Sequence, residues 1–230
     1  MQLPFTLEQF LDVFRRYNES VGIAPIALTL LGAAAAGLAW SLHAWRHRVI
    51  AAILALLSLW TGVEYHWAFF TKINPAAWFF GALFVAQAAL LAVYGGMRGL
   101  LVFTARRNGV AVVGQLVVLY ALLVYPLLGW SLGHAYPAGP TFGAPCPTTI
   151  FFFGMTLLAI ESVPVTVVLL PMVWAAIGTS AALQLGMRED FGLGLSAAIV
   201  AIDLIRRRVK AMPRPRGLKA ARVGTRASRG

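Results

Sequence analysis

The chain has 230 residues, of which 60% are apolar and only 12% are charged, and its formal net charge at pH 7 is +11. Soluble domains of this size carry about 25% charged and about 45–50% apolar residues. The composition therefore excludes a soluble globular protein, a disordered chain and a nucleic-acid-binding protein as descriptions of the whole, and it indicates a polytopic membrane protein.

The first predicted element is a short amphipathic helix within residues 1–21. Thr6-Leu7-Glu8-Gln9 fits the capping-box pattern that begins many helices. Apolar residues then recur at helical spacing, and charged residues occupy the positions between them. We expect this helix to lie in the membrane interface on the outer, periplasmic side.

Residues 22–205 are predicted to form a bundle of transmembrane helices, so the expected fold class is all-α. Long stretches of this region contain no Asp, Glu, Lys or Arg, and a spanning helix needs roughly 20 mostly apolar residues. Seven spans are expected. Six are the alternative, because the last segment is short and contains Asp203. The segments are 22–42, 49–70, 75–96, 110–132, 147–161, 163–184 and 190–205.

Residues 206–230 contain ten basic residues and no acidic residue, whereas the rest of the chain is nearly neutral. We expect a disordered cytoplasmic tail held near anionic lipid headgroups, at roughly 1 kcal/mol for each basic residue close to the surface. Nucleic-acid binding by this tail is the less favoured alternative. The predicted membrane-surface anchor consists of Arg206, Arg207, Arg208 and Lys210.

The basic residues also predict the topology. With seven spans and the tail inside, fifteen basic residues lie in cytoplasmic stretches and four in outer stretches, as the positive-inside rule requires. Six spans would place either the tail or most of the loop arginines outside. We therefore expect a periplasmic N-terminus and a cytoplasmic C-terminus.

Candidate binding residues gather at the outer ends of the predicted spans. Ionisable side chains within a membrane are costly and usually functional, although Glu64 and His66 could instead make only hydrogen bonds between helices. The loop 133–149 has no ionised side chain and is rich in Pro and Gly, so we expect it to pack over the outer mouth of the bundle. The candidate ligand-binding residues are Glu64, Tyr65, His66, Lys72, His134 and Tyr136.

Cys146 is the only cysteine, which excludes an intramolecular disulfide. It precedes Pro147 and is expected to be the N-cap of the fifth helix. Together with His66 and His134 it supplies ligand types that suit zinc or copper, although no spacing motif supports a metal site. The simpler alternative is a buried thiol at a rigid helix start.

The sequence contains no phosphate-binding loop, no Ser-His-Asp order and no metalloprotease motif, so we expect no enzymatic activity. The leading hypothesis is a small-ligand or metal site at the outer mouth that serves transport or sensing. The alternative is a non-catalytic subunit of a larger membrane complex, whose partners would be other membrane subunits or a second copy of the chain.

Three stretches carry a resemblance to a known family: Pro4–Phe14 with Tyr17-Asn18, Tyr65–Pro75, and Gly133–Thr149. They resemble an uncharacterised family of small bacterial integral membrane proteins, a domain of unknown function. The similarity covers most of residues 4–205, and Pro145-Cys-Pro-Thr-Thr149 is its most specific part. The resemblance implies a location in the bacterial inner membrane and one compact domain. It implies no activity and no functional residue.

Overall fold

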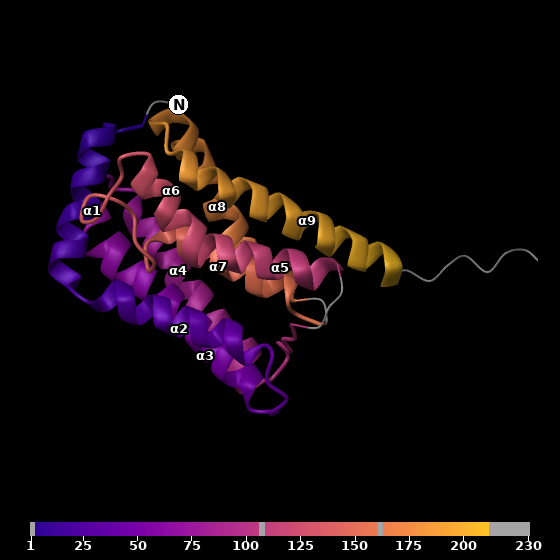
Figure 1. Ribbon diagram of the computed structural model, residues 1–230. Helices are drawn as coiled ribbons and strands as arrows, with labels where there is room; N and C mark the ends of the chain where they lie inside the picture. Colours follow the sequence, from indigo (N-terminus) through magenta and orange to yellow (C-terminus); the bar gives the residue numbers. More distant parts are fainter. Residues whose placement is uncertain (1–2, 106–108, 161–162, 212–230) are drawn as a thin grey trace, which may run out of the picture.

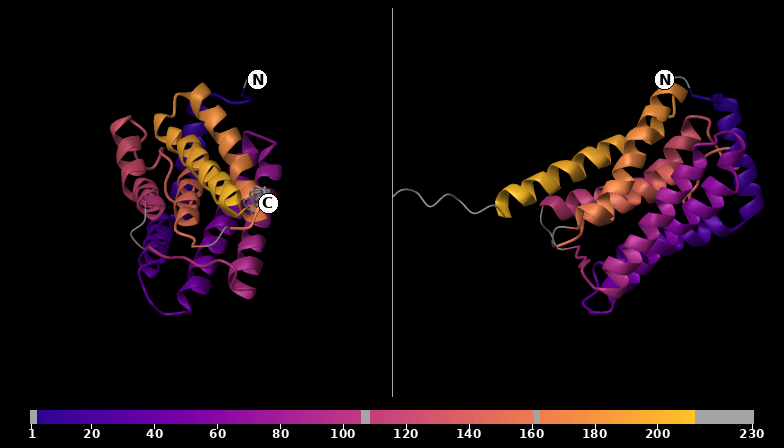
Figure 2. Two further views of the ribbon diagram at one scale, coloured as in Figure 1. Left: turned by 90° about the vertical axis from the view of Figure 1, so that its right-hand side faces the viewer. Right: turned by 180° about the vertical axis from the view of Figure 1, so that it is seen from behind.

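The computed structural model describes residues 3–105, 109–160 and 163–211, and all the regular elements of these residues are helical. The helices lie side by side along the length of one bundle, and the exception is the first helix, which crosses one end (Figures 1 and 2). The expected all-α class is confirmed. In chain order the helices after α1 are α2 (Ala24–Leu38), α3 (Arg46–Trp60), α4 (Ala77–Leu91), α5 (Gly109–Leu119), α6 (Tyr125–Ser131), α7 (Pro145–Leu157), α8 (Val165–Leu185) and α9 (Phe191–Ala211).

Several rods contain turns of another helical type. Wider π-helical turns extend α3 and α4 and connect α5 to α6, so that each of these three rods runs on without a loop. Short 3₁₀ turns follow the first of these rods and precede α9. These turns are η1 (Thr61–Trp67), η2 (Phe70–Lys72), η3 (Ala92–Met97), η4 (Tyr120–Val124) and η5 (Arg188–Asp190).

Helix α1 (Leu7–Val21) is the predicted amphipathic helix. Its capping box is present, because the Gln9 amide donates to Thr6 Oγ1 at 3.3 Å and the Thr6 amide donates to Gln9 Oε1 at 2.9 Å. Gly22 has a positive φ of 56° and ends the helix, and the axis then turns by 87° into α2. The apolar face of α1 packs onto the bundle through Phe14 and Tyr17, both of which are buried.

Four helical segments are long and apolar enough to cross a membrane, and a fifth qualifies if the bent pair α1–α2 counts as one span. This is fewer than the seven predicted from sequence. The shortfall has two causes: α2 and α7 have only 15 and 13 residues, and α9 carries Asp203 and several arginines near its end. The four segments are Arg46–Lys72, Ala77–Met97, Gly109–Ser131 and Val165–Leu185.

Helix α7 is the centre of the bundle, since every one of its residues is buried. It packs mainly against α5 and α9. The approach to α5 is close because two glycines face each other, and a Cβ added at Gly154 would lie 2.9 Å from the Val118 amide nitrogen and 3.0 Å from the Gly114 carbonyl oxygen. Only glycine at these positions lets the two backbones lie so near.

The two ends of the bundle differ in charge. We call the end crossed by α1 the α1 end, and the end where α9 finishes the tail end (Figure 1). Six of the eight acidic residues of the sequence lie at the α1 end, in α1, η1 and η5, whereas the basic residues of α9 lie at the tail end. Exposed tryptophans occur at both ends: Trp78 and Trp130 are 62% and 70% exposed at the α1 end, and Trp40 and Trp45 are 58% and 53% exposed at the tail end.

The predicted boundary of the basic tail needs correction. Arg206, Arg207, Arg208 and Lys210 belong to α9, which continues to Ala211, so the predicted anchor is a helical surface rather than the start of a tail. The prediction of disorder for the rest of the tail concerns residues 212–230, which lie outside the described residues.

Candidate functional site

Two adjacent carboxylates are buried at the α1 end, where α8 turns into α9. Gly186, with a φ of +74°, ends α8, and the short turn η5 leads directly into α9. This turn brings Glu189 and Asp190 under the surface, with exposed fractions of 0% and 3%. The neighbouring Arg188 is exposed, and within the described residues it forms no ion pair with either acid. The charge of the pair must therefore be balanced from other elements.

Glu189 is held by the loop that follows α6. Its Oε1 atom lies 2.5 Å from His134 Nδ1, and this hydrogen bond becomes an ion pair when the imidazole is protonated. Tyr120 of η4 donates to the Glu189 main-chain carbonyl at 2.7 Å. The second carboxylate oxygen, Oε2, is buried without a hydrogen-bond partner among the described residues. Among the described residues, the His134 imidazole is thus the basic side chain that contacts this pair of carboxylates.

Asp190 is held by neutral donors. Tyr125 of α6 donates to Asp190 Oδ1 at 2.5 Å, and the Cys146 thiol of α7 is its second hydrogen-bonding neighbour. Burial raises the pKa of Asp190 to about 7, and the charge of Glu189 acts in the same direction, while the hydrogen bonds of Tyr125 and Cys146 and the charge of His134 oppose the rise. Burial thus favours the protonated form of this carboxyl group at higher pH than in an exposed aspartate.

Further buried polar groups lie in η1 and α4. His66 is fully buried, with its ring stacked on Phe84 at 5.2 Å between centroids and edge-on to Trp174 at 5.0 Å. Within the described residues, neither ring nitrogen of His66 has a hydrogen-bond partner, and the same is true of the Tyr65 hydroxyl and the Gln87 amide. Polar atoms buried without partners are rare in folded proteins and call for a functional or solvent explanation.

A family model described as a family of unknown function, DUF6064, matches residues 7–214. The chain belongs to the DUF6064 family. No curated protein and no solved structure gives a significant match. The match covers the whole bundle from α1 to α9, and it confirms that part of the sequence-based resemblance which points to a family without an assigned function.

The fold places the predicted ligand-binding residues in four different settings. His134 belongs to the cluster of buried carboxylates, and Tyr65 and His66 are among the buried polar groups of η1 and α4. Glu64 is half-buried and makes no hydrogen bond or ion pair with the described residues. The other two residues point outward: Lys72 is exposed over the Phe69 ring, 4.8 Å from its centroid, and Tyr136 is 63% exposed.

The three predicted metal ligands of this DUF6064 chain are not brought together. His66 is surrounded by aromatic rings, His134 contacts Glu189, and Cys146 contacts Asp190. Among the described residues there is no group of three or more His, Cys, Asp or Glu side chains arranged to hold a metal ion. The geometry therefore gives the zinc or copper interpretation no support.

The uncharged loop before α7 is ordered against the α1 end, as predicted. The Asn18 side chain, which is fully buried, donates to the Pro137 and Gly139 carbonyls at 2.7 and 2.9 Å and accepts from Thr141 Oγ1 at 2.7 Å. The helix start differs from the prediction, because α7 begins at Pro145 with Ala144 as its N-cap. Proline suits the first helical turn because it lacks an amide hydrogen that would need a partner there.

The sequence analysis missed Glu189, Asp190 and Tyr125, which form the centre of the site. One signal could have revealed the two acids: they stand between two long apolar segments, in a connection of only a few residues. Tyr125 gave no comparable signal, since it lies within an apolar segment with aromatic residues on many sides.

Proposed function

We propose that this protein is a multi-pass membrane protein that binds a proton at the cluster of Glu189, Asp190, His134 and Tyr125, in the service of transport or sensing. The observation that carries the proposal is the pair of adjacent buried carboxylates with a single imidazole beside them. An ionised carboxylate without a nearby cation is costly to bury, so the pair favours retention of one proton.

The close packing of the cluster supports a proton as the ligand in place of a metal or a larger solute. Tyr125 is 1% exposed and Cys146 is 7% exposed, and both are in hydrogen-bonding contact with Asp190. Tyr65, His66 and Gln87 are also buried and have unused hydrogen-bonding capacity. They supply the groups through which protonation at the α1 end would be communicated into the bundle.

The membrane arrangement that accompanies this proposal has the α1 end outside and the tail end in the cytoplasm of a bacterial cell. The exposed tryptophans at both ends of the bundle support it, since aromatic residues gather at the two membrane interfaces. The arginines of the tail end support the same orientation. Seven crossings remain compatible with the short α7, because a helix enclosed by protein does not need to match the thickness of the lipid.

The proposal is tested by infrared difference spectroscopy on the purified protein between pH 5 and pH 8. We expect a protonated-carboxyl band that disappears as the pH rises, that is absent in Asp190→Asn and that persists in Glu64→Gln. The Glu64 variant is the matched control, because it removes an acid from the same end but outside the cluster. A band that survives in Asp190→Asn would contradict the proposal.

Transport and sensing are separated by reconstitution into liposomes that contain a pH-sensitive dye. A transporter dissipates an imposed pH gradient, and Asp190→Asn abolishes that flux while Glu64→Gln retains it. A sensor shows the infrared signal without flux.

A further inference from the structure

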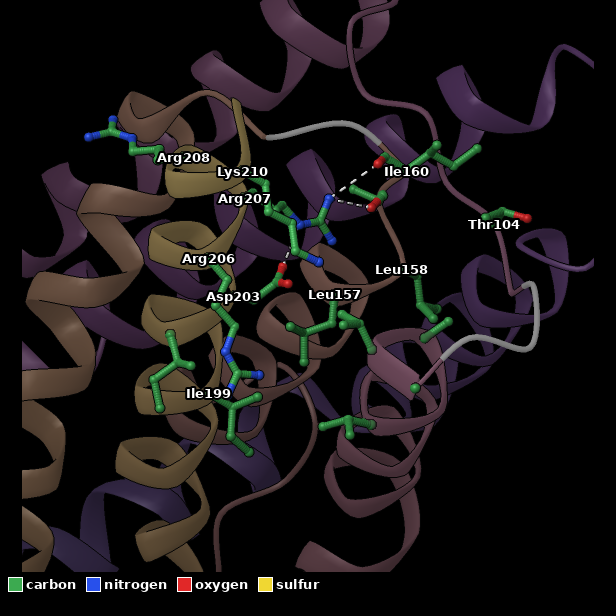
Figure 3. A pocket seen from close by; sticks show the side chains of 16 residues that line it. Thr104, Leu157, Leu158, Ile160, Ile199, Asp203, Arg206, Arg207, Arg208 and Lys210 are labelled. Atoms are coloured by element: carbon green, nitrogen blue, oxygen red, sulfur yellow. Dashed lines mark hydrogen bonds and ion pairs between the residues drawn. The ribbon is translucent and has the colours of Figure 1, made fainter. Parts of the chain in front are cut away.

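A second site lies at the tail end, away from the carboxylate cluster. It is a cavity of about 1160 Å³ between α5, the end of α7 and the last turns of α9 (Figure 3). The cavity follows from helix lengths, because α7 has 13 residues and α9 has 21. At 1.5 Å per residue, α7 is roughly 12 Å shorter than α9, and space remains beyond its last turn.

The cavity has an apolar part and a basic part. Along α9, Ile199 and Ile202 come first. The basic residues follow within the next two turns (Figure 3). Residues of α5 and α7 complete the apolar wall. The apolar lining includes Val110, Val113, Leu157, Leu158, Ile199 and Ile202, and the basic lining consists of Arg206, Arg207, Arg208 and Lys210.

The Arg207 side chain is bound to other residues of the protein. Its Nε atom donates to Asp203 Oδ2 at 2.6 Å, and its Nη1 atom donates to the Ala159 carbonyl at 2.9 Å. This arginine therefore neutralises the acid that lines the cavity and satisfies a carbonyl left open at the end of α7. Its role is to hold α9 against α7.

The other three basic residues have no such partners. Arg206, Arg208 and Lys210 are exposed, and within the described residues they form no ion pair or hydrogen bond. Three cations that have no ionic partner among the described residues thus stand at the rim of a cavity whose floor is apolar. A ligand that complements both parts must carry negative charge at one end and a hydrocarbon chain at the other.

We propose that this cavity binds one anionic phospholipid, with its phosphate at Arg206 and Lys210, which lie about one turn apart on α9, and an acyl chain against Ile199, Ile202 and Val113. Guanidinium groups bind phosphate oxygens through paired hydrogen bonds, and basic pockets between helices on the cytoplasmic side are suited to acidic headgroups. A zwitterionic lipid would add a positive group beside these cations, and free phosphate would leave the apolar wall unused. This site adds a defined lipid to the proton site at the opposite end.

The test is native mass spectrometry of the full-length protein with dioleoyl phosphatidylglycerol or dioleoyl phosphatidylcholine as the probe. We expect one phosphatidylglycerol to bind in preference to phosphatidylcholine. The triple variant Arg206→Gln/Arg208→Gln/Lys210→Gln should bind it at least about tenfold more weakly. The matched control is Arg214→Gln/Arg216→Gln/Lys219→Gln, which removes the same charge from the tail and should stay within about twofold of the wild type.

Two outcomes would overturn the proposal at this stage: equal weakening in the control triple variant, or equal binding of the two lipids. Either would mean that general attraction to a surface accounts for the binding.

A second variant tests the apolar wall independently of charge. Ile202 is 49% exposed, so Ile202→Asn should fold normally, and it should weaken phosphatidylglycerol binding while the cations remain. Inorganic phosphate at millimolar concentration should compete poorly with the lipid in the wild type. Efficient competition by phosphate, or unchanged lipid binding in Ile202→Asn, would show a simple anion site and would overturn the lipid assignment.

Discussion

The two ends of this molecule differ in whether their charged side chains are buried or exposed. At the α1 end, Glu189 and Asp190 are buried and their oxygens face neutral or weakly basic donors. At the tail end, Arg206, Arg208 and Lys210 stand exposed beside an apolar cavity. Burial makes a charge sensitive to pH, because ionisation is costly in a low-dielectric site. Exposure leaves a charged side chain accessible, so that it can contact a lipid or another partner.

The largest expected effect concerns the pH dependence of stability. A carboxyl pKa raised from 3.8 to about 7 by burial means that the folded state binds more protons than the unfolded state between these values. The free energy of unfolding therefore falls as the pH rises through this window, by up to about 1.4 kcal/mol per pH unit and about 4 kcal/mol in all.

Thermal unfolding followed by tryptophan fluorescence from pH 4 to pH 8 measures this dependence. Asp190→Asn should flatten the curve, whereas Arg206→Gln at the tail end should leave its shape unchanged. A wild-type curve that rises across the same window would contradict the assignment.

The next largest effect is expected at Asn18, which ties the ordered loop to the α1 end. Asn18→Ala removes three hydrogen bonds and leaves buried partners unsatisfied, at a cost of roughly 2–4 kcal/mol. The tail-end counterpart is Ser41→Ala, whose hydroxyl contacts His43 in an exposed turn, and its cost should stay within about 0.5 kcal/mol. Calorimetric unfolding measures the stability of both variants. A similar loss of stability in the two would contradict the view that the loop at the α1 end is held more firmly than the turn at the tail end.

A smaller effect is expected in the middle of the bundle, where α7 joins the two ends. Gly154→Ala places a methyl group against the Val118 backbone and should destabilise the protein by about 1–3 kcal/mol. Gly37→Ala in α2 is the control, since no atom lies within 4 Å of the added Cβ; it should be neutral or slightly stabilising. The melting temperatures of the two variants measure this difference in stability. An unchanged melting temperature in Gly154→Ala would mean that α5 and α7 can move apart at no cost.

The last prediction concerns accessibility and has little effect on stability. Cys146 is buried, so a bulky membrane-impermeant maleimide should label it slowly in intact cells and faster after unfolding. In a Cys146→Ser background, Ser20→Cys at the α1 end should be labelled in intact cells, and Ser41→Cys at the tail end only after permeabilisation. Labelling of both new cysteines from the same side would refute an arrangement with the two ends on opposite sides.

The features that sequence reasoning predicted are those encoded locally. The capping box at Thr6 and the alternation of apolar and charged residues that follows it predict α1, and the lack of charge in the loop 133–149 predicts its packing. Each of these patterns lies within a few turns of chain. Their physical causes, hydrogen-bond satisfaction and burial of apolar area, act on neighbours in sequence.

The features that it missed depend on contacts between distant segments. Tyr125 and Asp190 are 65 residues apart, and His134 and Glu189 are 55 residues apart. Composition and periodicity indicate that these residues lie near helix ends. They do not indicate which helix ends are in contact in the folded protein. These two pairs form only because α6 packs against η5. Glu64, which from sequence is an equally plausible member of the site, lies outside them.

The complete enclosure of α7 has a consequence for biogenesis. In the proposed membrane arrangement, a 13-residue helix is too short to be inserted as an independent segment, because a span needs roughly 20 apolar residues. The adjoining α8 meets that requirement. In that arrangement we expect helix α7 to enter the membrane together with α8 and to take its place once α5 and α9 surround it. Assembly of the bundle would then be completed at its centre, after the outer helices have been inserted.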